Sequence, residues 1–379
     1  MRAAMGLALA LACAPPPPDV ALLTSERAVE RRTLYTIDWR AQVRSDLAPE
    51  PPLNVDLLRW APQETASPTV IPIEQEVVVG STAGVLHAFS LDGQPLWEAR
   101  TVGAITTSAT YAEGRVYVAA GGGSVYAFDA ASGRQLWSHD LGEEPATPPV
   151  VSAGAIYVAT HQASVFAIDA ATGERKWHYR RERERPFTLR TVAAPRPAGD
   201  VVYTGFSDGE IVALSVKSGD VVWQKSSGPG DQFVDADATP QLLGSHVYVA
   251  SFAEGVSALD EKDGGLAWHV SFRGVTGLLL GNGILFATAI GKVAAFAPTD
   301  GSLLWEKGLG ERSPGPPRLA GSVLAVPTTE EILLLDQHSG TQLGQGFSPG
   351  RGVDAPPAFA GRELYVLSNA GWLYALGIR

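Results

Sequence analysis

One sequence pattern recurs along this chain and constrains its fold more strongly than any other feature. The pattern starts with a small and an apolar residue, usually continues with Asp, and places Gly six positions and Trp ten positions after its start. Residues 167–177 are one complete copy. Seven copies are present, of which one is a residue shorter and one, starting at Leu334, has Gly344 in place of Trp. Successive Trp residues lie 37 to 46 positions apart, and this period predicts a propeller or a solenoid.

Each repeat contains four short segments with the alternation that is typical of β-strands. Residues 147–151, 155–159, 164–168 and 175–179 are one such set, rich in β-branched and aromatic residues. The connections are short and contain Gly, which adopts positive φ easily. Because no segment shows a helical apolar stripe, the repeats predict an all-β fold built from four-stranded antiparallel propeller blades. We expect the repeated Trp to pack one blade on the next rather than to form a ligand cage.

The two ends of the chain each supply part of one more blade. Residues 355–359, 363–367 and 372–376 have the pattern of the first three strands of a repeat. Residues 57–60, Leu-Leu-Arg-Trp, have the pattern of a fourth strand without the first three. We therefore expect an eight-bladed β-propeller that is closed by pairing of N- and C-terminal strands, which removes the open sheet edges.

The first residues have the layout of a secretory signal. A positive start precedes a short apolar run that ends in small residues before Cys13, the only cysteine. Residues 10–13, Ala-Leu-Ala-Cys, resemble a bacterial lipobox, so we expect Cys13 to be acylated; an incidental Cys is the alternative. The predicted organisation is a lipoprotein signal peptide at residues 1–12, the acylated Cys with a Pro-rich tether at 13–53, and the propeller at 54–379.

Composition and motifs argue against two classes of function. The net charge of -11 disfavours a nucleic-acid partner, because phosphates require a basic surface. The seven His residues have no metal-ligand spacing, and neither a nucleophile elbow nor a phosphate-binding loop is present. Asp235 and Asp237 could flank a metal or act as acid and base, but no third oxygen ligand is evident. The sequence thus predicts no enzyme, no cofactor and no metal.

Two spacings exceed the 40 residues of the regular repeats, and both excesses fall in adjacent blades. The interval from Trp177 to Trp223 is six residues longer, and the interval from Trp223 to Trp268 is five residues longer. Insertions of this kind map to loops on one face of a repeat protein, often the binding face. We therefore expect the two insertions to be neighbours.

The insertions contain the residue types of a protein interface. Phe187 and Leu189 lie beside Arg190 in the first, a mixture typical of binding hot spots. Asp235 and Asp237 in the second offer acidic acceptors. The alternative is that Leu189 belongs to the core and the Asp residues form turns. The charged run at residues 180–185 is interpreted as a solvated loop, with an electrostatic contact as the alternative.

These residues carry a resemblance to a known family. The repeats resemble the PQQ-like repeats of quinoproteins, and the chain from about Asp56 onwards is similar to the eight-bladed outer-membrane-protein assembly lipoproteins of the Bam complex. Residues 187–190 match a Leu-Thr-Leu-Arg segment of that family with Phe in first position, and residues 235–240 match Asp-Val-Asp-Thr-Thr-Pro. In the family these segments contact the periplasmic POTRA domains of the barrel-inserting subunit.

The resemblance implies a function and a place in the cell. It implies a non-enzymatic scaffold, a monomeric propeller within a complex, anchored by lipid at the periplasmic face of the outer membrane. The partner-binding residues that it implies are Phe187, Leu189, Arg190, Asp235 and Asp237.

Two other functions stay open from the sequence. A dehydrogenase that uses pyrroloquinoline quinone and Ca²⁺ would predict a longer chain with neighbouring cysteines and a central calcium set, none of which is visible. A propeller that binds a polysaccharide or another envelope protein in its central channel is the second alternative, because propellers are reused for many partners.

Overall fold

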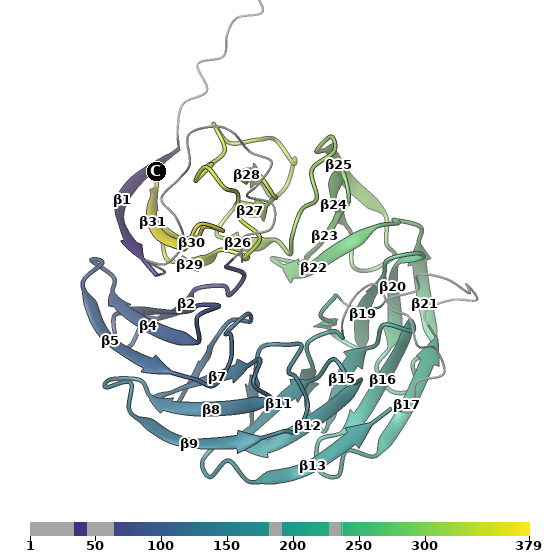
Figure 1. Ribbon diagram of the computed structural model, residues 1–379. Coiled ribbons are helices and arrows are strands. Elements are labelled where there is room, and N and C mark those ends of the chain that lie inside the picture. The colour runs from purple at the N-terminus through teal and green to yellow at the C-terminus, as the bar shows by residue number, and fades with distance from the viewer. Residues whose placement is uncertain (1–33, 44–63, 182–191, 227–235, 237) are drawn as a thin grey trace, which may run out of the picture. The chain divides into compact units, whose positions relative to one another are not determined.

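The fold is known from a computed structural model, which describes residues 34–43, 64–181, 192–226, 236 and 238–379. Within these ranges the chain forms β-strands and no helix, as the repeats predict. The strands form eight antiparallel sheets, which follow one another around a ring within the unit Thr33–Arg379 (Figure 1). The prediction of an eight-bladed β-propeller is confirmed.

The first four blades use the strands in chain order. Blade 1 comprises β2 (Thr69–Ile71), β3 (Glu76–Gly80), β4 (Val85–Ser90) and β5 (Pro95–Arg100). Blade 2 comprises β6 (Thr110–Ala112), β7 (Arg115–Ala120), β8 (Ser124–Asp129) and β9 (Gln135–Asp140). Blade 3 comprises β10 (Val150–Ser152), β11 (Ala155–Ala159), β12 (Ser164–Asp169) and β13 (Arg175–Arg180). Blade 4 comprises β14 (Arg196–Ala198), β15 (Val201–Gly205), β16 (Glu210–Ser215) and β17 (Val221–Ser226).

The remaining blades complete the ring. Blade 5 comprises β18 (Gln241–Leu243), β19 (His246–Ser251), β20 (Gly255–Asp260) and β21 (Leu266–Val270). Blade 6 comprises β22 (Val275–Gly281), β23 (Ile284–Ala289), β24 (Lys292–Phe296) and β25 (Leu303–Gly308). Blade 7 comprises β26 (Arg318–Ala320), β27 (Val323–Pro327) and β28 (Ile332–Asp336). Blade 8 comprises β29 (Ala358–Ala360), β30 (Glu363–Leu367), β31 (Trp372–Ile378) and β1 (Tyr35–Gln42).

The strand that closes the ring differs from the predicted one. β1 pairs antiparallel with β31, and Trp39 lies opposite Ala375, as Trp137 lies opposite Ala127 in blade 2. The outer edge of β31 is thus occupied by residues 35–42, so the prediction that residues 57–60 supply this strand is wrong. Residues 57–60 themselves lie outside the described residues. The predicted boundary at residue 54 therefore leaves one strand of the propeller in the tether.

Blade 7 lacks a regular fourth strand. Its sheet has three strands, and the following residues make only two isolated bridges, Leu335 with Gln342 and Ile332 with Phe347. This is the blade whose repeat has Gly344 in place of Trp. The loss of the repeated Trp and the loss of the regular strand occur in the same place.

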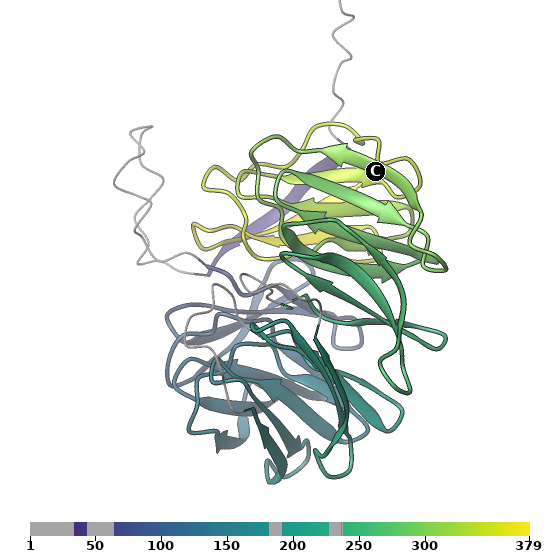
Figure 2. The same ribbon diagram turned by 90° about the vertical axis from the view of Figure 1, so that its right-hand side faces the viewer.

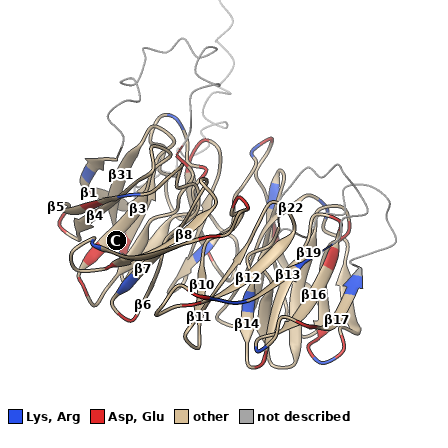
Figure 3. Cartoon of the chain, turned by 60° about the horizontal axis from the view of Figure 1, so that its bottom comes forward, with Lys and Arg blue, Asp and Glu red and all other residues tan. Residues whose placement is uncertain are grey.

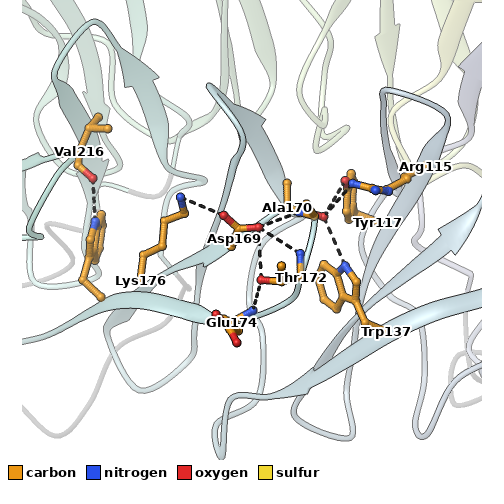
Figure 4. A network of polar contacts seen from close by, with 11 residues as sticks. Arg115, Tyr117, Trp137, Asp169, Ala170, Thr172, Glu174, Lys176 and Val216 are labelled. Carbon is orange, nitrogen blue, oxygen red and sulfur yellow. Dashed lines mark hydrogen bonds and ion pairs between the residues drawn. The ribbon is translucent and has the colours of Figure 1, made fainter.

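The Asp and Gly of the repeat build the turn between the third and fourth strands. In blade 3, Asp169 Oδ1 accepts hydrogen bonds from the amides of Ala171 and Thr172 at 2.9 and 3.0 Å (Figure 4). The Lys176 ammonium and these amides lower the pKa of Asp169. Gly173 has a φ of +79°, and a Cβ there would lie 2.7 Å from the indole of Trp137. The turn therefore requires Gly for two reasons, its backbone conformation and the ring packed against it.

The repeated Trp joins each blade to the next. Trp137 in blade 2 donates its Nε1 hydrogen to the carbonyl of Ala170 in blade 3 at 3.3 Å, where Tyr117 Oη also donates at 3.0 Å (Figure 4). We call the pairing of one Trp with the carbonyl and Gly of the next blade an indole contact. Within the described residues seven indole contacts are present: Trp39 to Leu91, Trp97 to Ala130, Trp137 to Ala170, Trp177 to Val216, Trp223 to Glu261, Trp268 to Pro298 and Trp305 to Gln337.

The propeller has two faces with different connections. Because the strands are antiparallel, the first-to-second and third-to-fourth turns lie on one face, which we call the indole face. The second-to-third turns and the connections between blades lie on the other, which we call the loop face. The side view of Figure 2 shows these connections leaving from opposite ends of the strands. Charged residues lie mostly in turns and at strand ends (Figure 3), and the strand interiors form apolar clusters shared by neighbouring blades.

Candidate functional site

The five residues predicted to bind a partner belong to the two insertions of the sequence. Phe187, Leu189, Arg190, Asp235 and Asp237 are all outside the described residues. The first insertion connects β13 of blade 3 with β14 of blade 4, and the second connects β17 of blade 4 with β18 of blade 5. The described residues at the ends of these insertions show where each one leaves and rejoins the propeller.

The first insertion is fixed at both ends by backbone hydrogen bonds. The amide of Arg181 donates to the carbonyl of Ala163 at 3.1 Å, where the insertion leaves blade 3. The amide of Ala193 donates to the carbonyl of Gly205 at 2.9 Å, and Thr204 Oγ1 donates to the Ala193 carbonyl at 2.9 Å. Ala193 is fully buried. The insertion therefore rejoins the propeller against the end of β15.

The second insertion rejoins the propeller at the neighbouring residue. The amide of Ala236 donates to the carbonyl of Phe206 at 3.1 Å, and Ala236 is buried. A Cβ at Gly205 would lie 2.2 Å from the Ala236 carbonyl oxygen, so this close approach requires Gly. The described ends of the two insertions thus bond to consecutive residues, Gly205 and Phe206, and lie side by side on blade 4.

An ion-pair cluster lies at the same turn. Arg181 Nε lies 2.7 Å from Asp208 Oδ2, and its Nη1 contacts the carboxylate of Glu210. The guanidinium also lies over the Phe206 ring, 5.8 Å from the ring centroid. All three charged side chains are less than one-fifth exposed. A charge cluster this far from water is costly to break, since removal of the cation leaves two unpaired carboxylates close together.

The cluster corrects the interpretation of the charged run. The prediction of a solvated loop at residues 180–185 is wrong at its start, because Arg181 is mostly buried and paired, and Arg180 Nη1 lies 3.5 Å from Glu143 Oε1. Little in the sequence points to these pairs, because Asp208 occupies an ordinary turn between β15 and β16. Only the packing of blade 3 on blade 4 brings its carboxylate beside the start of the first insertion.

Two described titratable groups outside the Arg181 cluster have shifted pKa values. Burial lowers the pKa of His178 in β13, and its ring stacks on Phe166 at a centroid distance of 4.2 Å. Burial raises the pKa of Glu76 to about 7, but Glu76 lies in β3 of blade 1. Among the described residues no group of three or more His, Cys, Asp or Glu side chains is placed to hold a metal ion. The arrangement on the loop face of blades 3 to 5 can position two segments for binding.

A known protein family matches the chain over most of its length. The model of the family described as "Outer membrane protein assembly factor BamB" matches residues 81–290 and 253–379. The chain belongs to the BamB family. The family's description is that of an assembly factor, in agreement with the expectation that the chain is not an enzyme.

Individual BamB proteins are moderately similar in sequence. The factor from Legionella pneumophila is 30% identical over 199 residues, which cover 50% of this chain and 52% of the relative. The factor from Salmonella typhimurium is 28% identical over 326 residues, covering 81% of this chain and 83% of the relative. The chain spans about half the length of the Legionella relative that it matches.

Solved structures share the fold. BamB from Moraxella catarrhalis superposes with a TM-score of 0.73 at 20% identity, over 90% of this chain and 99% of that one. The quinohemoprotein alcohol dehydrogenase from Comamonas testosteroni superposes with a TM-score of 0.70 at 16% identity, over 91% of this chain and 76% of the enzyme. At these sequence identities, the structural similarity supports the propeller fold and nothing more. In the part of the chain that the structure describes, no helix is long and apolar enough to span a membrane.

Proposed function

We propose that this BamB-family chain is a periplasmic scaffold lipoprotein of the outer-membrane β-barrel assembly machinery, and that it binds the POTRA domains of the barrel-inserting subunit. Family membership supports the assembly role. The proposed binding surface rests on one observation: the described ends of both insertions form hydrogen bonds to blade 4, one to Gly205 and the other to Phe206. Two insertions that rejoin the propeller at consecutive residues can present their side chains to one partner.

The proposed mechanism is binding and orientation. Phe187 and Leu189 would supply apolar anchors, Arg190 a bidentate donor, and Asp235 and Asp237 acceptors for a basic group. Because hydrogen bonds fix the described ends of both insertions, less conformational entropy is lost at these ends when a partner binds. Acylation of Cys13, which lies outside the described residues, would hold the propeller at the membrane surface.

A triple variant tests the binding surface. We expect Leu189→Ala with Arg190→Ala and Asp235→Ala to retain the melting temperature of the wild type and to lose co-purification with the barrel-inserting subunit from solubilised membranes. Hot-spot side chains contribute about 2 kcal/mol or more each, and because such contributions are not additive, we expect the affinity to fall by at least about a hundredfold.

The matched control changes exposed charges on the opposite face. Arg134 and Asp220 lie in third-to-fourth turns of the indole face, and both are exposed. The double variant Arg134→Ala with Asp220→Ala should bind as the wild type does. Full binding by a correctly folded triple variant would show that the partner uses another surface.

A further inference from the structure

At the interface between blades 7 and 8, the backbone carbonyl that would accept the indole hydrogen bond is present, but no described indole donates to it. In blade 2 the acceptor of the indole contact is Ala130, whose amide donates to the Gly114 carbonyl at 3.0 Å. In blade 8 the corresponding residue is Ile378, whose amide donates to the Arg362 carbonyl at 2.8 Å. Among the described residues no side chain donates to the Ile378 carbonyl. Among the described residues, the position that an indole fills at seven interfaces is therefore taken by no indole at this one.

A groove lies at this position on the indole face. Its volume is about 320 Å³, at the lower end of the range for ligand sites. The first-to-second turns of blades 7 and 8 form two of its walls, and the end of β31 forms the third. The apolar part of the lining comes from Val323, Phe359 and Ile378. Its size and lining suit one aromatic side chain with the backbone on either side of it.

The groove is also lined by two cationic side chains. The side chains of Arg362 and Arg379 line it, and both residues are exposed. No acidic side chain of the described residues forms an ion pair with either of them. Two guanidinium groups that pair with no described carboxylate, beside an apolar surface, are notable in a chain with a net charge of -11. They complement a carboxylate held next to an apolar side chain.

We propose that this groove binds an extended segment of another protein that presents a tryptophan beside an acidic residue. The indole N–H donates to the Ile378 carbonyl, as the chain's own indoles do at the other interfaces. The ring packs on Phe359 and Val323, and the neighbouring carboxylate pairs with Arg362 and Arg379. The partner thus supplies in trans the side chain that blade 7 lacks. The groove lies on the indole face, opposite the strand ends that flank the two insertions, so its occupation does not depend on the function proposed above.

The test uses the full chain and a labelled peptide. The probe is a fluorescein-labelled hexapeptide of sequence Gly-Ser-Trp-Asp-Ser-Gly, and fluorescence anisotropy measures its binding. We expect saturable binding, a loss of at least tenfold in affinity when the peptide Trp is replaced by Ala, and a smaller loss when Asp is replaced by Asn. Absence of saturation, or equal affinity for the Trp and Ala peptides, would overturn the proposal.

Two variants test whether the peptide binds in the groove. Arg362→Glu reverses one of the groove charges, and Ser322→Trp fills the groove from an exposed turn residue of blade 7. Each should weaken binding at least tenfold, whereas Arg134→Glu, an exposed turn arginine of blade 2, should change the affinity by less than twofold. Circular dichroism melting confirms that each variant is folded. Equal weakening by Arg134→Glu, or a dimer in light scattering that Arg362→Glu dissolves, would overturn the proposal of a partner segment.

Discussion

The interface between blades 2 and 3 and the interface between blades 7 and 8 join neighbouring sheets in different ways. At the first, the indole of Trp137 packs on Gly173 and donates to the Ala170 carbonyl. At the second, Phe347 packs edge-on against Tyr35 and Tyr374, with ring centroids 5.4 and 5.2 Å apart. The indole contact between blades 2 and 3 recurs around the ring, whereas the Phe347 contacts occur where β1 closes the ring at blade 8.

The reason for the difference lies in the source of the fourth strand of blade 8. That strand is β1, so blade 8 has no turn that joins its third strand to its fourth. A Trp in blade 7 would find no Gly turn on which to pack, and the repeat in blade 7 has Gly344 instead. The Trp and the Gly of one repeat therefore serve two different interfaces. Gly173 receives Trp137 from the preceding blade, whereas Trp177 of the same copy packs on Gly219 of the next.

The largest expected effect is the loss of one indole. Trp177 is 7% exposed and donates to the Val216 carbonyl at 2.8 Å. Trp177→Ala should lower the free energy of unfolding by about 3–5 kcal/mol, because it removes the buried ring and leaves a cavity between blades 3 and 4. Urea denaturation followed by fluorescence measures this. Leu96→Ala, at a half-exposed position of β5, should cost less than about 0.5 kcal/mol. Similar losses in both variants would mean that the indole contacts do not hold the ring together.

A smaller effect is expected for the glycine beneath the indole. Gly173→Ala should lower the free energy of unfolding by about 2–3 kcal/mol, from the left-handed backbone and from the clash with Trp137. The control is Gly154→Ala. Gly154 has a similar φ of +71°, but a Cβ there meets nothing within 4 Å, so only the backbone cost of about 1 kcal/mol applies. Urea unfolding measures both changes. Equal losses of unfolding free energy in Gly173→Ala and Gly154→Ala would show that the Trp137 indole does not pack tightly on the Gly173 turn.

The smallest effect on the free energy of unfolding is expected at the interface between blades 7 and 8. Phe347→Leu keeps most of the apolar volume but removes the two edge-on ring contacts with Tyr35 and Tyr374. The free energy of unfolding should fall by about 1 kcal/mol, the usual size of an aromatic pair beyond its buried area. Urea denaturation measures the change. A loss as large as that of Trp177→Ala would show that this aromatic cluster is equivalent to an indole contact.

The repeat predicts most of the fold because its residues act locally. The Asp and Gly fix a turn within six residues, and the small residue stands opposite the Trp in the same hairpin, as Ala127 stands opposite Trp137. The spacing of a few residue types therefore indicates both the number of blades and the exceptional blade 7. The insertions are visible in the same way, as excess length between copies.

The closing strand could not be chosen from the pattern. Residues 35–42 and 57–60 both have strand character and both contain a Trp, and a sequence pattern does not say which segment meets the edge of β31. Only the three-dimensional pairing of Trp39 with Ala375 shows which one does. The charged run is hard to interpret for a similar reason, since Arg181 finds Asp208 and Glu210 through the packing of blade 3 on blade 4.

The sequence by itself determined that this chain forms a ring of similar blades with two longer connections on neighbouring blades. The tertiary structure alone decided how the ring closes and where the described ends of those connections are fixed. The physical reason is the range of the interactions. Turns and hairpins depend on residues a few positions apart, whereas closure, the ion-pair cluster at Arg181 and the groove at Ile378 depend on surfaces that meet only when the blades are assembled.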